Sequence, residues 1–125
     1  MELQTIVVVW TTHAPDFLPP DACQVVCDAL RVSAWRAGGS VLACRVTHNS
    51  TRMVAQIPVD HDTRQFIVWV RAATRFAVAR VTNGPLPQWD DAYTYYGVNA
   101  MMVADEIAHC FTMPPIPAVP LVYEH

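Results

Sequence analysis

The chain has 125 residues, of which 53% are hydrophobic and only 15% charged, and its formal net charge is −3. This length is typical of one domain with its own core, and the low charged fraction leaves less polar surface than a monomer of this size usually has. All eight basic residues are dispersed arginines, which argues against a reader of duplex nucleic acid, and the lack of lysine excludes Schiff-base chemistry and a P-loop.

The first half of the chain shows the pattern of a strand, a helix and a hairpin. Residues 3–12 are rich in β-branched side chains and are predicted to form a central strand. The segment 19–39 begins with two prolines and ends with a pair of glycines, which is the usual punctuation of a helix. Segments 40–47 and 51–59 flank the short turn "HNS", so a hairpin is expected there.

Four cysteines occur without the basic and apolar regions of a secretory signal, which predicts free thiols in a reducing, cytoplasmic compartment. Cys23 and Cys27 lie four residues apart on the apolar face of the predicted helix, and this spacing is typical of core packing rather than of a zinc site. Cys44 and Cys110 add no metal-binding motif, so no metal or cofactor is predicted. No apolar run reaches the roughly 18 residues needed to cross a bilayer.

Residues 62–83 allow two interpretations. In one, a single helix spans the segment and ends at Asn83 and Gly84. In the other, Asp62 caps a short helix to about Thr74, and residues 75–82 form a strand of alternating side chains. The second interpretation is preferred because it completes a sheet of about four strands.

The region 89–111 is predicted to be a third helix, with Asp90 and Asp91 at its N-terminal end. The expected fold is therefore α+β, a two-layer sandwich with an antiparallel sheet in the ferredoxin-like order β-α-β-β-α-β, an additional C-terminal helix and an extended Pro-rich arm. Residues 1–112 form the single predicted domain, and residues 113–125 form the arm.

Apolar side chains on the last helix and the arm exceed what one helix face can bury, which is typical of protein interfaces. The sequence therefore predicts a non-enzymatic protein that self-associates as a homo-oligomer or docks into a larger particle, such as a virion or a secretion component. Its partners would be proteins, with no nucleic-acid duplex and no membrane. The predicted interface residues are Trp89, Tyr93, Tyr95, Met102, Pro114, Pro115, Ile116, Pro117, Val119, Leu121 and Val122.

The alternative hypothesis is a small dimeric enzyme or ligand-binding protein with a pocket near Trp10, His13 and His61. His13 follows the first strand, and His61 lies beside Asp60, so the two imidazoles could serve as acid and base. The competing interpretation of "VDHDT" is a helix N-cap with a solvated histidine, because aspartate is a preferred cap.

Overall fold

The computed structural model describes residues 2–13 and 18–112 and confirms the predicted α+β fold with an additional C-terminal helix. The segment predicted to form the arm, residues 113–125, lies outside the described residues. The elements in chain order are β1 (Leu3–Thr12), α1 (Pro20–Arg36), β2 (Ser40–Val46), β3 (Ser50–Pro58), α2 (Thr63–Thr82), β4 (Trp89–Val98), the 3-10 turn η1 (Ala100–Met102) and α3 (Val103–Thr112).

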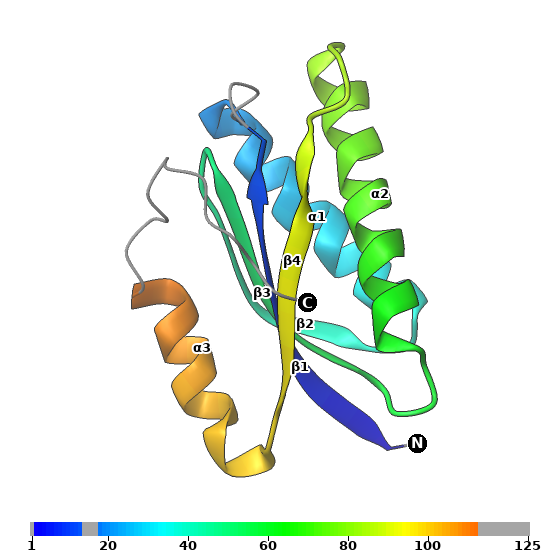
Figure 1. The fold of residues 1–125 in the computed structure, drawn as a ribbon, viewed down its shortest axis with the longest axis vertical. Helices are drawn as coiled ribbons and strands as arrows, with labels where there is room; N and C mark the ends of the chain where they lie inside the picture. Colours follow the sequence, from blue (N-terminus) through cyan, green and yellow to red (C-terminus); the bar gives the residue numbers. More distant parts are fainter. Residues whose placement is uncertain (1, 14–17, 113–125) are drawn as a thin grey trace.

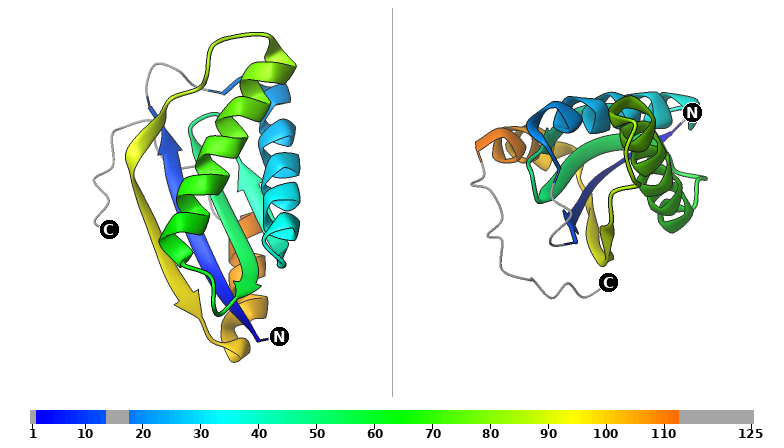
Figure 2. Two further views of the ribbon diagram at one scale, coloured as in Figure 1. Left: turned by 90° about the vertical axis from the view of Figure 1, so that its right-hand side faces the viewer. Right: turned by 90° about the horizontal axis from the view of Figure 1, so that it is seen from above.

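The four strands form one antiparallel sheet in the order β2-β3-β1-β4, which is the predicted ferredoxin-like arrangement. Helices α1 and α2 lie side by side on one face of this sheet, and α3 lies on the other side (Figure 1). The left view of Figure 2 shows α1 and α2 in front of the sheet with α3 behind it. One face of the sheet therefore packs against two helices and the other against α3.

The main core lies between the sheet and the helices α1 and α2. Because successive side chains of a strand point to opposite faces, β1 contributes Ile6, Val8 and Trp10 to this core. The same alternation directs Val7 and Val9 into a smaller cluster beneath α3, which also contains Ala43, Val54 and Cys110. Strand β1 is thus buried on both faces, as its apolar sequence predicts.

Helix α2 is one continuous helix, so the preferred prediction of a strand over residues 75–82 is wrong and the single-helix alternative is correct. The helix buries Phe66, Val70 and Ala77 along one face, at the spacing of an α-helix. Asp62 caps its N-terminus as predicted, accepting a hydrogen bond from the Gln65 amide at 3.2 Å. Asn83 ends the helix in the left-handed conformation, at φ 52°.

The predicted helix over residues 89–111 is wrong in its first half, because residues 89–98 form the edge strand β4. This segment is rich in aromatic and β-branched residues, which favour a strand, and its backbone pairs with β1 from Thr5↔Val98 to Thr12↔Trp89. The pairing supplies the fourth strand that the sequence analysis had assigned to residues 75–82. Helix formation is confined to η1 and α3 in the second half.

All four cysteines are free thiols, with Cys44 and Cys110 buried and Cys23 and Cys27 partly buried against the main core. Between them they occupy both apolar clusters of the fold, which is the packing role that the sequence predicts. Among the described residues, no helix combines the length and the apolarity needed to cross a membrane.

Candidate functional site on the α3 face of the sheet

The sheet face that carries α3, called the α3 face below, presents polar side chains around a narrow apolar strip. On β1 the strip consists of Val7 and Val9, and hydroxyl-bearing Thr5 and Thr11 flank it. The register places specific neighbours beside these residues. Across the sheet from β3 through β1 to β4, the aligned rows are Gln56, Thr5 and Val98; Val54, Val7 and Tyr96; and Arg52, Val9 and Thr94. Ser50 of β3 pairs with Thr11 of β1.

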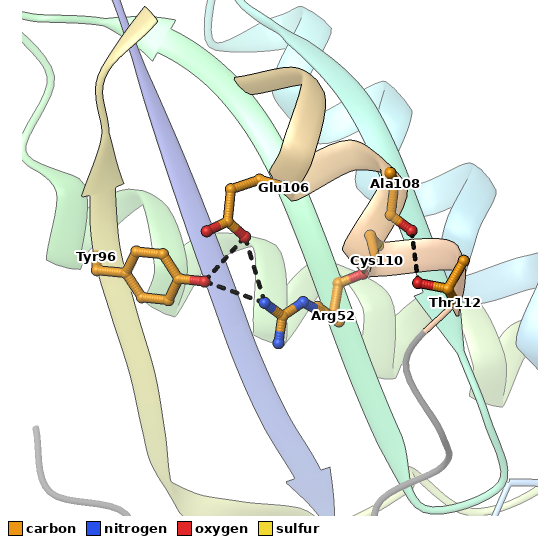
Figure 3. Close-up of polar contacts among 6 residues, drawn as sticks. All are labelled: Arg52, Tyr96, Glu106, Ala108, Cys110 and Thr112. Atoms are coloured by element: carbon orange, nitrogen blue, oxygen red, sulfur yellow. Dashed lines mark hydrogen bonds and ion pairs between the residues drawn. The ribbon is translucent and has the colours of Figure 1, made fainter. Parts of the chain in front are cut away.

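Three side chains from three elements meet over this face: Arg52 of β3, Tyr96 of β4 and Glu106 of α3 (Figure 3). The Tyr96 hydroxyl donates to Glu106 Oε2 at 3.0 Å, and Arg52 Nη2 donates to the Tyr96 oxygen at 3.0 Å. Arg52 Nη2 also lies 3.5 Å from Glu106 Oε2, so each of the three groups contacts the other two. We call these three residues the Arg–Tyr–Glu cluster.

The position of α3 follows from its apolar spacing. Val103, Ile107 and Cys110 recur at intervals of four and three residues, and Ile107 and Cys110 pack on the cluster beneath α3. The Cys110 thiol lies 3.8 Å from the Arg52 carbonyl oxygen, and α3 packs across both β2 and β3. Glu106, one residue before Ile107, points between Tyr96 and Arg52 (Figure 3).

A second arginine adjoins the cluster. Arg45 of β2 pairs directly with Arg52 of β3 in the sheet register. Like charges directly opposite each other on neighbouring strands are destabilising, so this pair needs compensation. Glu106 supplies a carboxylate to Arg52, and the Phe111 carbonyl at the C-terminal end of α3 accepts from Arg45 Nη1 at 3.3 Å. The face thus concentrates two guanidinium groups beside one carboxylate.

The surroundings of Tyr96 favour its protonated form. Burial raises the pKa of the Tyr96 hydroxyl, and the hydrogen bond to Glu106 raises it further, although the charge of Arg52 opposes both effects. Tyr96 is nevertheless 42% exposed, so a ligand can reach it. The cluster therefore combines a phenol, a carboxylate that accepts its hydrogen bond, and a guanidinium, the group that binds phosphate through paired donors.

A second polar group lies at the end of the face where β1 finishes. His13 Nδ1 is 3.1 Å from Asp90 Oδ1, and the Thr11 hydroxyl donates to the other oxygen of the same carboxylate. A carboxylate is a hydrogen-bond acceptor, so this contact requires a proton on Nδ1 of His13. Among the described residues, no three His, Cys, Asp or Glu side chains gather as a metal site.

The pocket predicted near Trp10, His13 and His61 is not assembled. In the register, Thr11 pairs with Ser50 at one end of the sheet and Leu3 with Pro58 at the other, so His13 and His61 lie at opposite ends. Trp10 is fully buried in the main core. Asp60 and His61 are exposed in the turn before α2, where Asp62 alone provides the predicted cap.

The described residues of the predicted interface point mainly into the protein. Trp89 is buried against Trp10, with ring centroids 6.0 Å apart, and Tyr93 and Tyr95 pack on the main core. The Tyr95 hydroxyl accepts from Arg64 Nε of α2 at 3.2 Å. Met102 is exposed, and the remaining predicted interface residues, from Pro114 to Val122, lie outside the described residues.

The sequence analysis singled out neither Arg52 nor Glu106, and Tyr96 fell within the helix that it predicted over residues 89–111. One signal for Arg52 was present: a charged residue interrupts the apolar run of the second hairpin strand, "TRMVAQI". A charge in a strand at the centre of a sheet needs a partner on the same face. Glu106 carried no comparable signal, because its position depends on where α3 packs.

No model of a known protein family matches the sequence, and no curated protein matches it. Two solved structures share the fold. One is a putative transposase from Deinococcus radiodurans, with a TM-score of 0.68 and 15% identity over 87% of this chain and 89% of that one. The other is a REP-associated tyrosine transposase bound to a REP hairpin, with a TM-score of 0.63 and 11% identity over 86% of this chain. This chain covers 64% of the second protein's length.

These neighbours overturn the predicted function. The sequence predicted a non-enzymatic protein that self-associates or docks into a larger particle, such as a virion or secretion component, with no nucleic-acid duplex as a partner. The two solved structures described above that share its fold are instead a putative transposase and a tyrosine transposase bound to a REP hairpin. The physical error concerned the arginines. Dispersal along the chain does not imply dispersal in space, because the hairpin of β2 and β3 brings Arg45 and Arg52 together on one face.

Proposed function

We propose that this protein acts on DNA, binding a DNA hairpin, or the single strand next to one, across the α3 face. The observation that carries the proposal is the Arg–Tyr–Glu cluster on a fold shared with transposases, one of them a tyrosine transposase bound to a hairpin. A cytoplasmic location, as predicted from the cysteines, fits this role and remains part of the proposal.

Arg52 and Arg45 are the groups proposed to hold the DNA backbone. Guanidinium groups bind phosphate through paired N–H donors, and phosphate contacts supply most of the affinity of proteins for DNA. A bound phosphate would add a negative charge beside these two arginines, which face each other across β2 and β3. The net charge of −3 does not oppose this arrangement, since a local pair of cations is sufficient to place one phosphate.

The same geometry supports a defined reaction class, transfer of a DNA strand to tyrosine. The Tyr96 oxygen would attack the phosphorus atom, forming a phosphotyrosine bond as the bond from phosphorus to the deoxyribose oxygen breaks. Glu106 Oε2, which already accepts the hydrogen bond from the Tyr96 hydroxyl, would take the phenolic proton and return it to the departing oxygen. Arg52 would stabilise the charge on the phosphate oxygens.

Binding of a fluorescent DNA hairpin, measured by anisotropy at several salt concentrations, tests the proposal. We expect Arg52→Gln to weaken hairpin binding by about 10- to 100-fold, because a hydrogen bond to a charged group contributes about 1.5–3 kcal/mol. The slope of log Kd against log salt should also fall, because one phosphate contact is lost.

Arg64→Gln is the matched control, because it removes the same charge from α2, on the opposite side of the sheet, where Arg64 contacts Tyr95. It should bind the hairpin almost as well as the unmodified protein. Absence of hairpin binding at low salt, or equal losses in the Arg52 and Arg64 variants, would show that the α3 face is not the DNA-binding surface.

A further inference from the structure

An open cavity of about 630 Å³ lies on the α3 face next to the Arg–Tyr–Glu cluster. Its floor includes Thr5 of β1 and Gln56 of β3, which are direct neighbours in the sheet register. Gly97 and Val98 of β4 border it, and Ala100 and Val103 close it from the side of η1 and α3. Leu3 and Gln4 complete the lining.

The cavity is continuous with the cluster through two elements. Val98 lies two residues beyond Tyr96 on the same face of β4, which corresponds to about 7 Å along a strand. Val103 precedes Glu106 by three residues on α3, which is close to one helical turn, or about 5 Å. A phosphate held between Arg52 and Tyr96 would therefore have the cavity within reach of the base next to it.

The lining suits a flat, partly polar ligand. It combines the apolar residues Val98 and Val103 with Thr5, which carries a hydroxyl, and Gln56, which carries an amide. An amide carries a donor and an acceptor side by side, which is the pattern that pairs with adenine. The volume lies within the range of pockets that enclose small molecules.

We propose that this cavity binds one unpaired base of the DNA, with adenine preferred, and that Gln56 reads its edge. This inference rests on the proposed function, because the phosphate bound at the cluster brings the base to the cavity. It adds a sequence preference that neither phosphate contacts nor hairpin shape can supply. The site is distinct from the cluster, since no side chain belongs to both.

The test compares five DNA hairpins that differ at one unpaired position beside the stem: each of the four bases, or an abasic residue. We expect the unmodified protein to bind the adenine hairpin about tenfold more tightly than the abasic one. Gln56→Leu should reduce this ratio to about twofold while leaving the affinity for the abasic hairpin unchanged. Gln24→Leu, which changes an exposed amide on α1, is the control and should keep the full ratio.

Ala100→Phe provides a second, independent variant, because Ala100 is exposed and a larger side chain there would fill the cavity. It should lower the ratio as Gln56→Leu does. Equal affinity of the unmodified protein for all five hairpins would refute base binding in the cavity but not the proposed DNA binding. The same conclusion would follow if both variants kept the full ratio of adenine to abasic affinity. Failure to bind any of the hairpins would overturn the proposed function and the pocket together.

Discussion

The Tyr96 hydroxyl lies between a cation and an anion, and this position determines its chemistry. It donates to Glu106 Oε2 and accepts from Arg52 Nη2, each at 3.0 Å. The side chains of Arg52 and Glu106 are only 12% and 19% exposed, so the two charges are partly shielded from water. Because the pKa of Tyr96 is raised by burial and by its hydrogen bond to Glu106, the phenol is protonated at neutral pH and needs a proton acceptor to react.

Formation of a covalent adduct with a labelled DNA hairpin, followed on denaturing gels, tests this role. The unmodified protein should form the adduct and Tyr96→Phe should not. Tyr95→Phe is the matched control, because it removes the neighbouring hydroxyl from the opposite face of β4 and should retain the adduct. Hairpin binding by the unmodified protein without any adduct would mean that the cluster binds DNA but does not react.

The pH dependence of the same assay tests the role of Glu106. Glu106→Gln should slow adduct formation by about 100- to 10,000-fold at neutral pH, the range for loss of a general base. The difference from the unmodified protein should narrow above about pH 10, where a tyrosine ionises without help. The two rates should approach each other at alkaline pH because the raised pKa of Tyr96 delays ionisation of its hydroxyl until then. A difference that stays constant with pH would argue against proton transfer to Glu106.

At the scale of elements, hydrogen bonds between α2 and the first residues of β4 position the edge strand. The N-terminus of α2 is fixed by Asp62, whose carboxylate accepts from the Gln65 amide. Its middle is tied to the sheet by Arg71, whose guanidinium donates to the carbonyl oxygens of Asp90 and Asp91. The Trp89 indole donates in turn to the Arg71 carbonyl at 2.8 Å. These bonds hold β4 at the edge of the sheet, where it presents Tyr96.

Loss of the α2 cap should destabilise the fold measurably. We expect Asp62→Ala to lower the free energy of unfolding by about 0.5–2 kcal/mol, the usual range for removal of an N-cap. Asp60→Ala removes an equal charge two residues earlier, from an exposed position that is not the cap, and should change it by less than about 0.5 kcal/mol. Chemical denaturation of the two variants gives both values, and equal losses would refute the assignment of Asp62 as the cap.

The sequence predicted the elements whose signals are local and mis-assigned those that depend on tertiary pairing. The prolines, the glycine pair and Asp62 mark the helix boundaries by themselves, so α1, the hairpin and the start of α2 were predicted correctly. Residues 75–82 and 89–98 both carry aromatic and β-branched side chains. Only the pairing of β4 with β1 decides which segment is the strand, and that contact is not visible in either segment alone.

At the scale of the whole molecule, the two faces of the sheet have separate roles. The face toward α1 and α2 buries the main core, including Trp10 and Ile57. The α3 face carries a short apolar strip and, around it, the Arg–Tyr–Glu cluster, the open cavity beside it and the Thr11, His13 and Asp90 group. The site could not be predicted from sequence because its three residues are 44 and 10 positions apart along the chain.

The most direct test of this account is a map of the backbone amide NMR signals that move when a DNA hairpin is added. We expect the signals of β3, β4 and α3 around Arg52, Tyr96 and Glu106 to shift most, whereas those on the outer surface of α1 and α2 should stay in place. Shifts concentrated on α1 and α2, or no shifts at hairpin concentrations that saturate the anisotropy signal, would contradict the claim that this protein binds DNA on the α3 face.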